Sequence, residues 1–128
     1  MKLVKEKPSN YEKIASKFNL KRNVVFTYGN ILYAPNTDKI PDHLWVHEET
    51  HEQQQGDNPE EWWNKYLEDD DFRLEQELEA YRNQFDFIKK TATRKQKTEF
   101  LNQIAKDLSS EIYGKIIDYK KARELIRK

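Results

Sequence analysis

Two histidines and a glutamate lie close together in the segment His47-Glu48-Glu49-Thr50-His51. Residues four apart on a helix face the same way, so both imidazoles can hold one metal ion with Glu48 beside a water on that ion. Zinc lowers the pKa of such a water from about 16 to about 7, and Glu48 can then take its proton. The spacing therefore predicts zinc ligands at His47 and His51 and a general base at Glu48.

A catalytic zinc site also needs a third protein ligand and one open position. Asp57 follows His51 by six residues, where the pattern H-E-x-x-H-x-x-G-x-x-H has its third ligand. That pattern uses a glycine three residues after the second histidine to turn the chain back toward the metal. Gln54 occupies this position, and a Met-turn is missing because Met1 is the only methionine. Asp57 is therefore the weaker candidate.

The stronger candidates lie in a later segment with helical spacing. Its apolar stripe comprises Leu74, Leu78, Tyr81, Phe85 and Ile88. At about 100° per residue, Glu77 lies some 60° from the centre of this stripe, Glu75 about 100° and Glu79 about 140°. Glu77 is therefore the carboxylate best placed to face inward as the third metal ligand. The alternative is that all three glutamates are solvated on the surface.

The segment from Glu77 to Tyr81, with the sequence ELEAY, resembles the E-x-E-A-D type segment that follows H-E-x-x-H in gluzincin metallopeptidases. The first glutamate of that segment is the third zinc ligand of the family, which implies Glu77. Tyr81 departs from the family pattern, because it replaces the aspartate that supports the first histidine. Three segments also resemble bacteriophage proteins described as metallopeptidases, over roughly residues 40 to 127: HEETHEQQQG, WWNKYLEDDDFRLEQELEAYRNQ and LSSEIYGKIIDYKKARELI.

Other residues have less specific roles. His43 and His51 are separated by about 12 Å along a helix axis, so all three histidines cannot bind one ion. We expect His43 to form a hydrogen bond at the helix end or with a residue that supports the ligands. An oxyanion needs a donor besides zinc, and three tyrosines remain open for this role: Tyr66, Tyr81 and Tyr113. The tryptophans are expected to pack in the core: Trp45, Trp62 and Trp63.

The elements that position the motif begin with a short helix, which apolar spacing predicts over residues 10–18. Two β-rich runs, residues 24–28 and 31–34, flank Gly29-Asn30 and predict a hairpin. Its strand from Ile31 to Ala34 is the expected edge for pairing with a peptide. The motif helix is expected from Pro41 to about Gln55.

Four further helices are expected after the motif. Asn58 and Pro59 begin one, and the acidic residues 69–71 begin another that extends to about Lys90. The third covers residues 93–108, and the last runs from Ser109 to Lys128. The sequence therefore predicts one mainly helical α+β domain over residues 1–128. The resemblance implies a minimal zincin-like fold, with a small β-hairpin before the motif helix and a helical bundle after it.

Composition excludes several classes of protein. The 128 residues include 23 basic and 23 acidic side chains, so no broad basic field favours nucleic acid or an anionic membrane. The absence of cysteine excludes disulfides and thiolate metal sites and suits a reducing compartment. No apolar stretch is typical of a signal peptide or a membrane span. We therefore expect a soluble, cytoplasmic protein, in the host cell cytoplasm if a phage encodes it.

The resulting hypothesis is a zinc-dependent peptidase that acts on a peptide or protein without a covalent intermediate. One alternative is a phage structural or interaction protein that binds metal without turnover. Another alternative is an accessory domain that cleaves one regulatory protein, and only while the domain is docked on that protein. The sequence makes no prediction about the oligomeric state.

Overall fold

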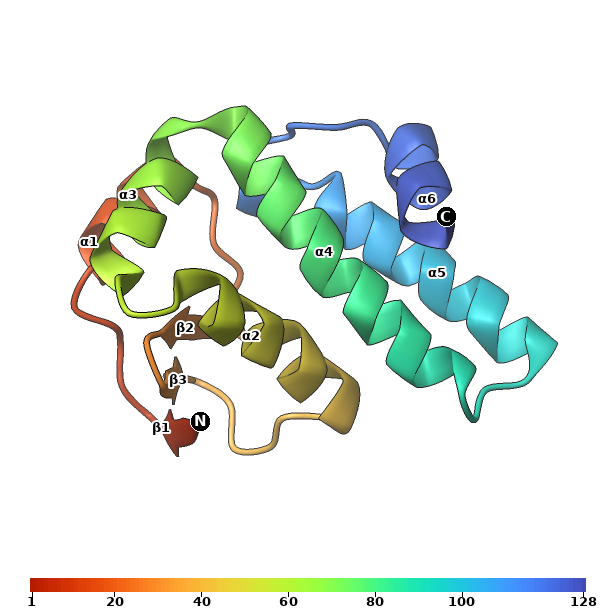
Figure 1. Ribbon diagram of the computed structural model, residues 1–128, viewed down its shortest axis with the longest axis horizontal. Coiled ribbons are helices and arrows are strands. Elements are labelled where there is room, and N and C mark those ends of the chain that lie inside the picture. Colours follow the sequence, from red (N-terminus) through yellow and green to blue (C-terminus); the bar gives the residue numbers. More distant parts are fainter.

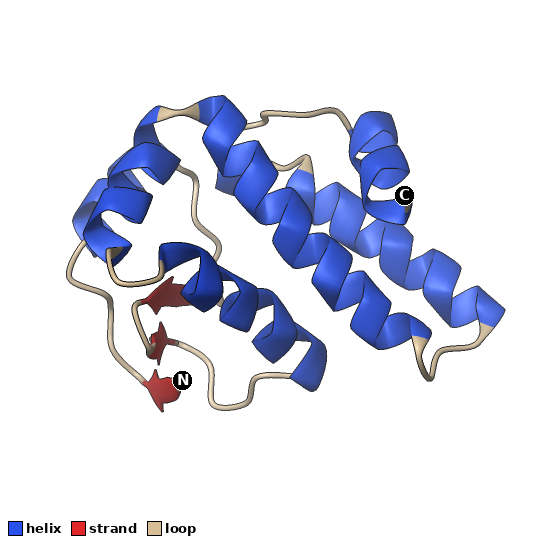
Figure 2. Ribbon diagram, in the orientation of Figure 1, coloured by secondary structure: helices blue, strands red, loops and turns tan.

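The structure is a computed structural model that describes residues 1–128. Its elements follow in the order β1 (Lys2–Val4), α1 (Tyr11–Lys17), β2 (Phe26–Tyr28), β3 (Ile31–Tyr33), α2 (Asp42–Gln55), α3 (Pro59–Glu68), α4 (Asp70–Lys89), α5 (Arg94–Leu108), the short 3-10 helix η1 (Glu111–Tyr113) and α6 (Tyr119–Arg127). Helices dominate and the sheet is small (Figure 2). The predicted α+β, mainly helical fold class is confirmed.

The sheet has three strands, with β3 at its centre. β2 and β3 form the predicted antiparallel hairpin, in which Gly29 has a φ of 62° that glycine adopts without steric cost. β1 pairs with β3 in parallel, and Lys2 lies opposite Ile31. The prediction that the strand from Ile31 to Ala34 is an edge is therefore wrong, because β1 covers its other side.

The helix that carries the motif lies between the sheet and α4, and α4 in turn packs against α5 and α6 (Figure 1). Two capped turns create this arrangement. Asn58 accepts a hydrogen bond from the Glu61 backbone N–H at 3.2 Å to begin α3, and Asp69 accepts one from Phe72 at 3.1 Å to begin α4. These turns bring α4 against α2, with only α3 between them in the sequence.

The predicted helix from Ser109 to Lys128 is interrupted. Gly114 and Lys115 have φ angles of 86° and 54°, and these left-handed conformations break the pattern of helical hydrogen bonds. A new helix begins after Asp118, whose side chain accepts a hydrogen bond from the Lys121 backbone N–H at 2.8 Å. The last helix is therefore α6 alone.

Apolar side chains form two buried clusters. The first joins α4, α5 and α6 and consists of Tyr81, Phe85, Leu101, Ile104, Ala105, Leu108, Ala122 and Ile126. The second joins α1, β2 and α3 and consists of Ile14, Phe18, Phe26, Trp62, Trp63 and Tyr66. Tyr113 packs against both clusters. Trp62 and Trp63 are therefore in the core as predicted, whereas Trp45 is only half-buried. No helix combines the length and the apolar character needed to cross a bilayer.

Candidate metal centre

The motif helix α2 is unusual because every residue that it buries is polar: His47, Glu48, Thr50, His51 and Gln55. A helix packed in a protein normally buries an apolar stripe. Burying a polar group costs free energy unless a hydrogen bond or a charge partner compensates. The buried face of α2 must therefore be held by specific partners from other elements.

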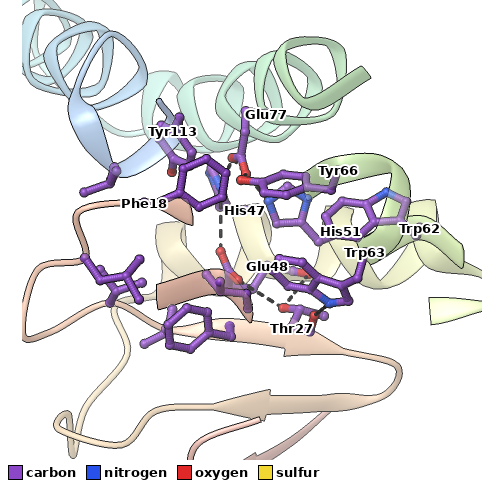
Figure 3. A pocket seen from close by; sticks show the side chains of 16 residues that line it. Phe18, Thr27, His47, Glu48, His51, Trp62, Trp63, Tyr66, Glu77 and Tyr113 are labelled. Atoms are coloured by element: carbon purple, nitrogen blue, oxygen red, sulfur yellow. Dashed lines mark hydrogen bonds and ion pairs between the residues drawn. The ribbon is translucent and has the colours of Figure 1, made fainter. Parts of the chain in front are cut away.

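Three possible ligand atoms converge where α2 faces α4 (Figure 3). His47 Nε2 lies 3.0 Å from Glu77 Oε1, and His51 Nε2 lies 3.3 Å from the same oxygen. The exposed fractions of His47, His51 and Glu77 are only 3%, 5% and 3%. The structure therefore brings the predicted third ligand to both histidines.

Hydrogen bonds on the far side of each ring determine which nitrogen faces Glu77. His47 Nδ1 lies 2.9 Å from Gln84 Oε1, and His51 Nδ1 lies 2.8 Å from Gln54 Oε1. An amide oxygen only accepts, so each Nδ1 donates and each Nε2 is left with a lone pair in the neutral ring. Two imidazole lone pairs and a carboxylate oxygen thus point at one place, which requires a cation there. These three side chains can bind a metal ion.

The two supporting glutamines are themselves held in place. The Gln84 amide donates to His43 Nδ1 at 2.8 Å, so His43 has the supporting position that the sequence predicted. Burial, and then the nearby charge of His47, lower the pKa of His43, which favours its neutral, accepting form. The Gln54 amide donates to the Gln76 carbonyl at 3.0 Å.

Sequence reasoning did not identify either glutamine. A signal existed for Gln84, because it follows Glu77 by seven residues, or about two helical turns, and therefore shares its face. Gln54 was considered only because it occupies the position of the glycine in the pattern H-E-x-x-H-x-x-G-x-x-H. Gln84 supports His47 from one side, and Tyr81 packs its ring 4.4 Å from the His47 ring.

The second oxygen of Glu77 accepts a hydrogen bond from the Tyr66 hydroxyl at 2.5 Å. Burial, and then the charge of Glu77, raise the pKa of Tyr66 well above its usual range, so the hydroxyl keeps its proton. Glu77 therefore presents one oxygen to the histidines and one to Tyr66. The other acidic candidates are exposed and lie outside this group: Asp57, Glu75 and Glu79.

Glu48 approaches the same nitrogen of His47 as Glu77 does, but from the side of the sheet (Figure 3). Its Oε2 is 3.6 Å from His47 Nε2, and its Oε1 accepts a hydrogen bond from the Thr27 hydroxyl at 3.0 Å. Burial raises the pKa of Glu48, although the neighbouring histidine charges oppose the shift. The carboxylate of Glu48 is therefore within reach of anything held between the histidines and Glu77.

These groups face a cavity of about 70 Å³ that is lined by all six residues of the second hydrophobic cluster. Most of the lining is apolar or aromatic, and the five other lining residues are Thr27, His47, Glu48, His51 and Glu77. Among the three candidate tyrosines, Tyr66 and Tyr113 line the cavity and Tyr81 does not. The hydroxyls of Tyr81 and Tyr113 lie 2.7 Å apart.

A buried arginine connects the tyrosines to the rest of the fold. Arg73 is only 1% exposed and donates to the backbone carbonyls of Tyr66 at 2.6 Å and Tyr113 at 3.0 Å. It also pairs with Asp70, and its guanidinium lies 4.9 Å from the centre of the Phe18 ring. Sequence reasoning missed Arg73, since a basic residue among acidic ones is typical of a solvated helix start.

β2 is the strand nearest to the cavity, but side chains already occupy its outer edge. The Thr27 carbonyl accepts hydrogen bonds from Trp63 Nε1 at 3.0 Å and from Gln55 Nε2 at 2.8 Å. The Gly29 backbone N–H donates to Gln55 Oε1 at 2.7 Å. A peptide would have to displace these bonds to pair with β2, so β-strand addition is not the favoured route to the cavity.

In the metal-free protein, a proton is bound between the two histidines and Glu77. Burial alone lowers the pKa of His51, but the charge and the hydrogen bond of Glu77 outweigh it and raise that pKa to about 9. The same interaction holds the pKa of Glu77 well below its usual range, although burial opposes it. The protonated His51 ring therefore provides the positive charge that the converging lone pairs require.

The raised pKa of His51 makes the metal-free fold sensitive to alkali. Protonated His51 stabilises the fold fully when the pH is below the ordinary pKa of histidine, about 6.5. This stabilisation is lost as the pH rises through the raised pKa of about 9. We expect the unfolding free energy, measured by urea denaturation in a chelator, to fall by about 2 kcal/mol between pH 7 and 9.5. His51→Gln should remove this decline. A decline of the same size in His51→Gln would contradict the assignment.

Gln84 offers a test of how the first histidine is held. We expect Gln84→Ala to weaken metal binding by about 10- to 100-fold, because His47 loses the acceptor that fixes its ring. Competition with a coloured chelator measures this affinity. Gln53, which is exposed on the same helix as the histidines, provides the matched control Gln53→Ala. Equal affinities of the two variants would show that Gln84 has no supporting role.

Comparison with known proteins returned no matching family model, no matching curated protein and no matching solved structure. The resemblance to gluzincin and bacteriophage segments therefore remains a prediction. What can be inferred about function depends on the chemistry of the converging side chains and on the cavity around them.

Proposed function

We propose that this protein is a zinc-dependent peptidase, in which His47, His51 and Glu77 hold the metal and Glu48 is the general base. One observation carries the proposal: two imidazole nitrogens and one carboxylate oxygen converge, and a second carboxylate lies 3.6 Å from His47 Nε2. The resemblance to gluzincin segments supports the same residues. A peptide or protein is the proposed substrate.

The donor set favours zinc over calcium and magnesium. Two imidazoles and one carboxylate are ligands of catalytic zinc, whereas calcium and magnesium prefer sites made of oxygen atoms. The distances of 3.0 and 3.3 Å from Glu77 Oε1 to the two Nε2 atoms also fit. With bonds of about 2.0 Å, two ligands of a tetrahedral zinc ion lie about 3.3 Å apart.

Zinc bound there supplies a Lewis acid, which polarises a peptide carbonyl and makes water acidic enough to lose a proton near neutral pH. Glu48 takes that proton as the water oxygen forms a bond to the carbonyl carbon. Glu48 then passes the proton to the departing nitrogen as the C–N bond breaks. The products are a carboxylate and an amine, and no covalent link to the chain forms.

Tyr113 is the tyrosine best placed to stabilise the developing negative charge on the carbonyl oxygen. It lines the cavity, whereas Tyr81 does not, and the hydroxyl of Tyr66 is committed to Glu77. Burial raises the pKa of Tyr113 well above its usual range, so its hydroxyl keeps a proton to donate. When Tyr81 donates to Tyr113, the Tyr113 proton is free for a substrate.

A second function, metal binding without turnover, is favoured by the enclosure of the centre. The two histidines, Glu48 and Glu77 are each at most 5% exposed, and the cavity of about 70 Å³ holds only a few water molecules. A peptidase of this design must open before a polypeptide reaches its ligands. A structural metal site needs no such opening.

The proposed function can be tested by removing and restoring the metal. Protein treated with a strong chelator should lose hydrolysis of an unstructured protein such as casein, and one equivalent of zinc should restore it. Calcium or magnesium should restore nothing. Metal content by mass spectrometry and cleavage by gel electrophoresis are the measurements. Metal-loaded protein that cleaves no peptide or protein would favour the role without turnover.

A further inference from the structure

A surface groove lies directly outside the metal cavity. It has a volume of about 450 Å³ and runs between the segment after α1 and the end of α5 with η1. Two half-buried aliphatic side chains, Leu20 and Ile112, line both the groove and the cavity. The wall between the solvent and the metal ligands is therefore formed in part by these two side chains.

The segment that carries Leu20 is held by few hydrogen bonds. From residue 19 to residue 25, its only backbone–backbone hydrogen bond joins the Val24 N–H to the Lys21 carbonyl at 3.4 Å. Two side-chain bonds also hold it: the Asn19 amide donates across the groove to Glu111 Oε2 at 2.9 Å, and the Asn36 amide donates to the Arg22 carbonyl at 2.8 Å. Few bonds must break for this segment to move, so local opening here costs little compared with opening elsewhere.

The groove has a positive charge. Lys21, Lys106 and Lys115 line it, against the single acidic residue Glu111. Glu111 pairs with Lys115 at 3.5 Å, whereas Lys21 and Lys106 form no ion pair. Burial raises the pKa of Asp107, and the nearby charges of Lys21 and Lys106 oppose that shift. Neither lysine is held in an ion pair, so both can attract an anionic ligand.

A second groove continues the first along α5. It has a volume of about 560 Å³ and shares Lys106 and Ser109 with the first groove. At its far side lies Tyr119, one of the two large hydrophobic residues that the protein exposes. The two grooves together form a track with polar, charged and aromatic side chains, in which three lysines outnumber Glu99 and Glu111. Such a track is suited to an extended polypeptide rather than to a small ion.

We propose that this track is the substrate entrance, that Leu20 and Ile112 form its gate, and that Lys21 and Lys106 select polypeptide segments with acidic side chains. The entrance deepens the proposed peptidase function, since it names the route and the class of substrate. The outer edge of β2 is occupied by Gln55 and Trp63, which leaves the track as the favoured approach.

The gate can be tested without any metal. Trp62 and Trp63 line the cavity and Trp45 does not, so the fluorescence of a Trp45→Phe protein reports on the cavity. In that background, Leu20→Ala with Ile112→Ala should raise the quenching constants of acrylamide and iodide by about threefold or more, because quenching follows solvent access. Ile117→Ala with Leu125→Ala, also half-buried, is the matched control. Equal quenching constants in the gate and control variants would contradict the proposal that Leu20 and Ile112 form the gate.

The lysines are tested by surface substitutions that leave the core intact. Lys21→Gln with Lys106→Gln should lower iodide quenching but not acrylamide quenching, while the exposed control pair Lys120→Gln with Lys121→Gln changes neither.

Peptide binding provides a second test of the two lysines. In Glu48→Gln protein, Lys21→Gln with Lys106→Gln should weaken binding of a glutamate-rich peptide by about tenfold at low salt and leave binding of a neutral peptide unchanged. Unchanged iodide quenching and unchanged binding of the glutamate-rich peptide would overturn the charge selection. The quenching and peptide-binding results could both be as expected in a protein that hydrolyses no peptide or protein. That outcome would support the entrance and contradict the proposed hydrolysis.

Discussion

Glu48→Gln should leave the metal in place and lower kcat for peptide hydrolysis by about 10²- to 10⁴-fold, the usual contribution of a general base. Glutamine has nearly the same shape as glutamate, and its amide oxygen can still accept the Thr27 hydroxyl, which lies 3.0 Å from Glu48 Oε1. It cannot take a proton from water. Metal content and steady-state kinetics on the same preparation measure the two effects separately.

The adjacent Glu49 provides the control for that substitution, because it is exposed and one residue away on the same helix. Glu49→Gln should retain both metal and activity. Full activity in Glu48→Gln would eliminate Glu48 as the base. Loss of metal from Glu48→Gln would mean instead that this carboxylate acts as a ligand.

Loss of any one of the three converging side chains should remove the metal. His47→Ala, His51→Ala and Glu77→Gln should each lower the metal content from about one ion per chain to near zero. The expected loss of affinity exceeds about 100-fold, since even residues that only support a ligand contribute 10- to 100-fold. Glu77→Gln is the most conservative of the three, because it keeps the volume and an acceptor for Tyr66. Mass spectrometry of dialysed protein gives the metal content.

Two carboxylates serve as controls for the third ligand. Glu75→Gln, two residues from Glu77 on the exposed side of α4, should retain the metal, and so should Asp57→Asn. Circular dichroism at low temperature checks that each variant is folded. If Asp57→Asn lost the metal while Glu77→Gln kept it, the assignment of the third ligand to α4 would be wrong.

The sequence predicted those parts of the centre that depend on local helix geometry. The spacing of His47, Glu48 and His51 places them on one face whatever the helix packs against. Glu77 was predicted from the apolar stripe of its own helix, because a residue near the stripe must face the interior. The hairpin around Gly29 was equally local, since a two-residue turn determines which residues pair.

The parts that the sequence did not predict depend on contacts between elements. The roles of Gln54, Gln84 and Arg73 follow from hydrogen bonds to side chains or carbonyls of other elements, and no periodicity encodes them. β1 has only three residues, too few to show the alternation of a strand, so the central position of β3 was missed. The break before α6 depends on the left-handed conformations of Gly114 and Lys115.

The contact between His47 and Glu77 joins positions 30 residues apart, and it lies between two hydrophobic clusters that share few side chains. An ion held there closes a loop of the chain much as a disulfide does, and this chain has no cysteine. A cross-link over such a loop lowers the entropy of the unfolded chain by an amount worth about 3 to 4 kcal/mol. Ligand variants should therefore be degraded faster in cells even where no substrate is present, and chelation should shorten the lifetime of the wild-type protein in the same way.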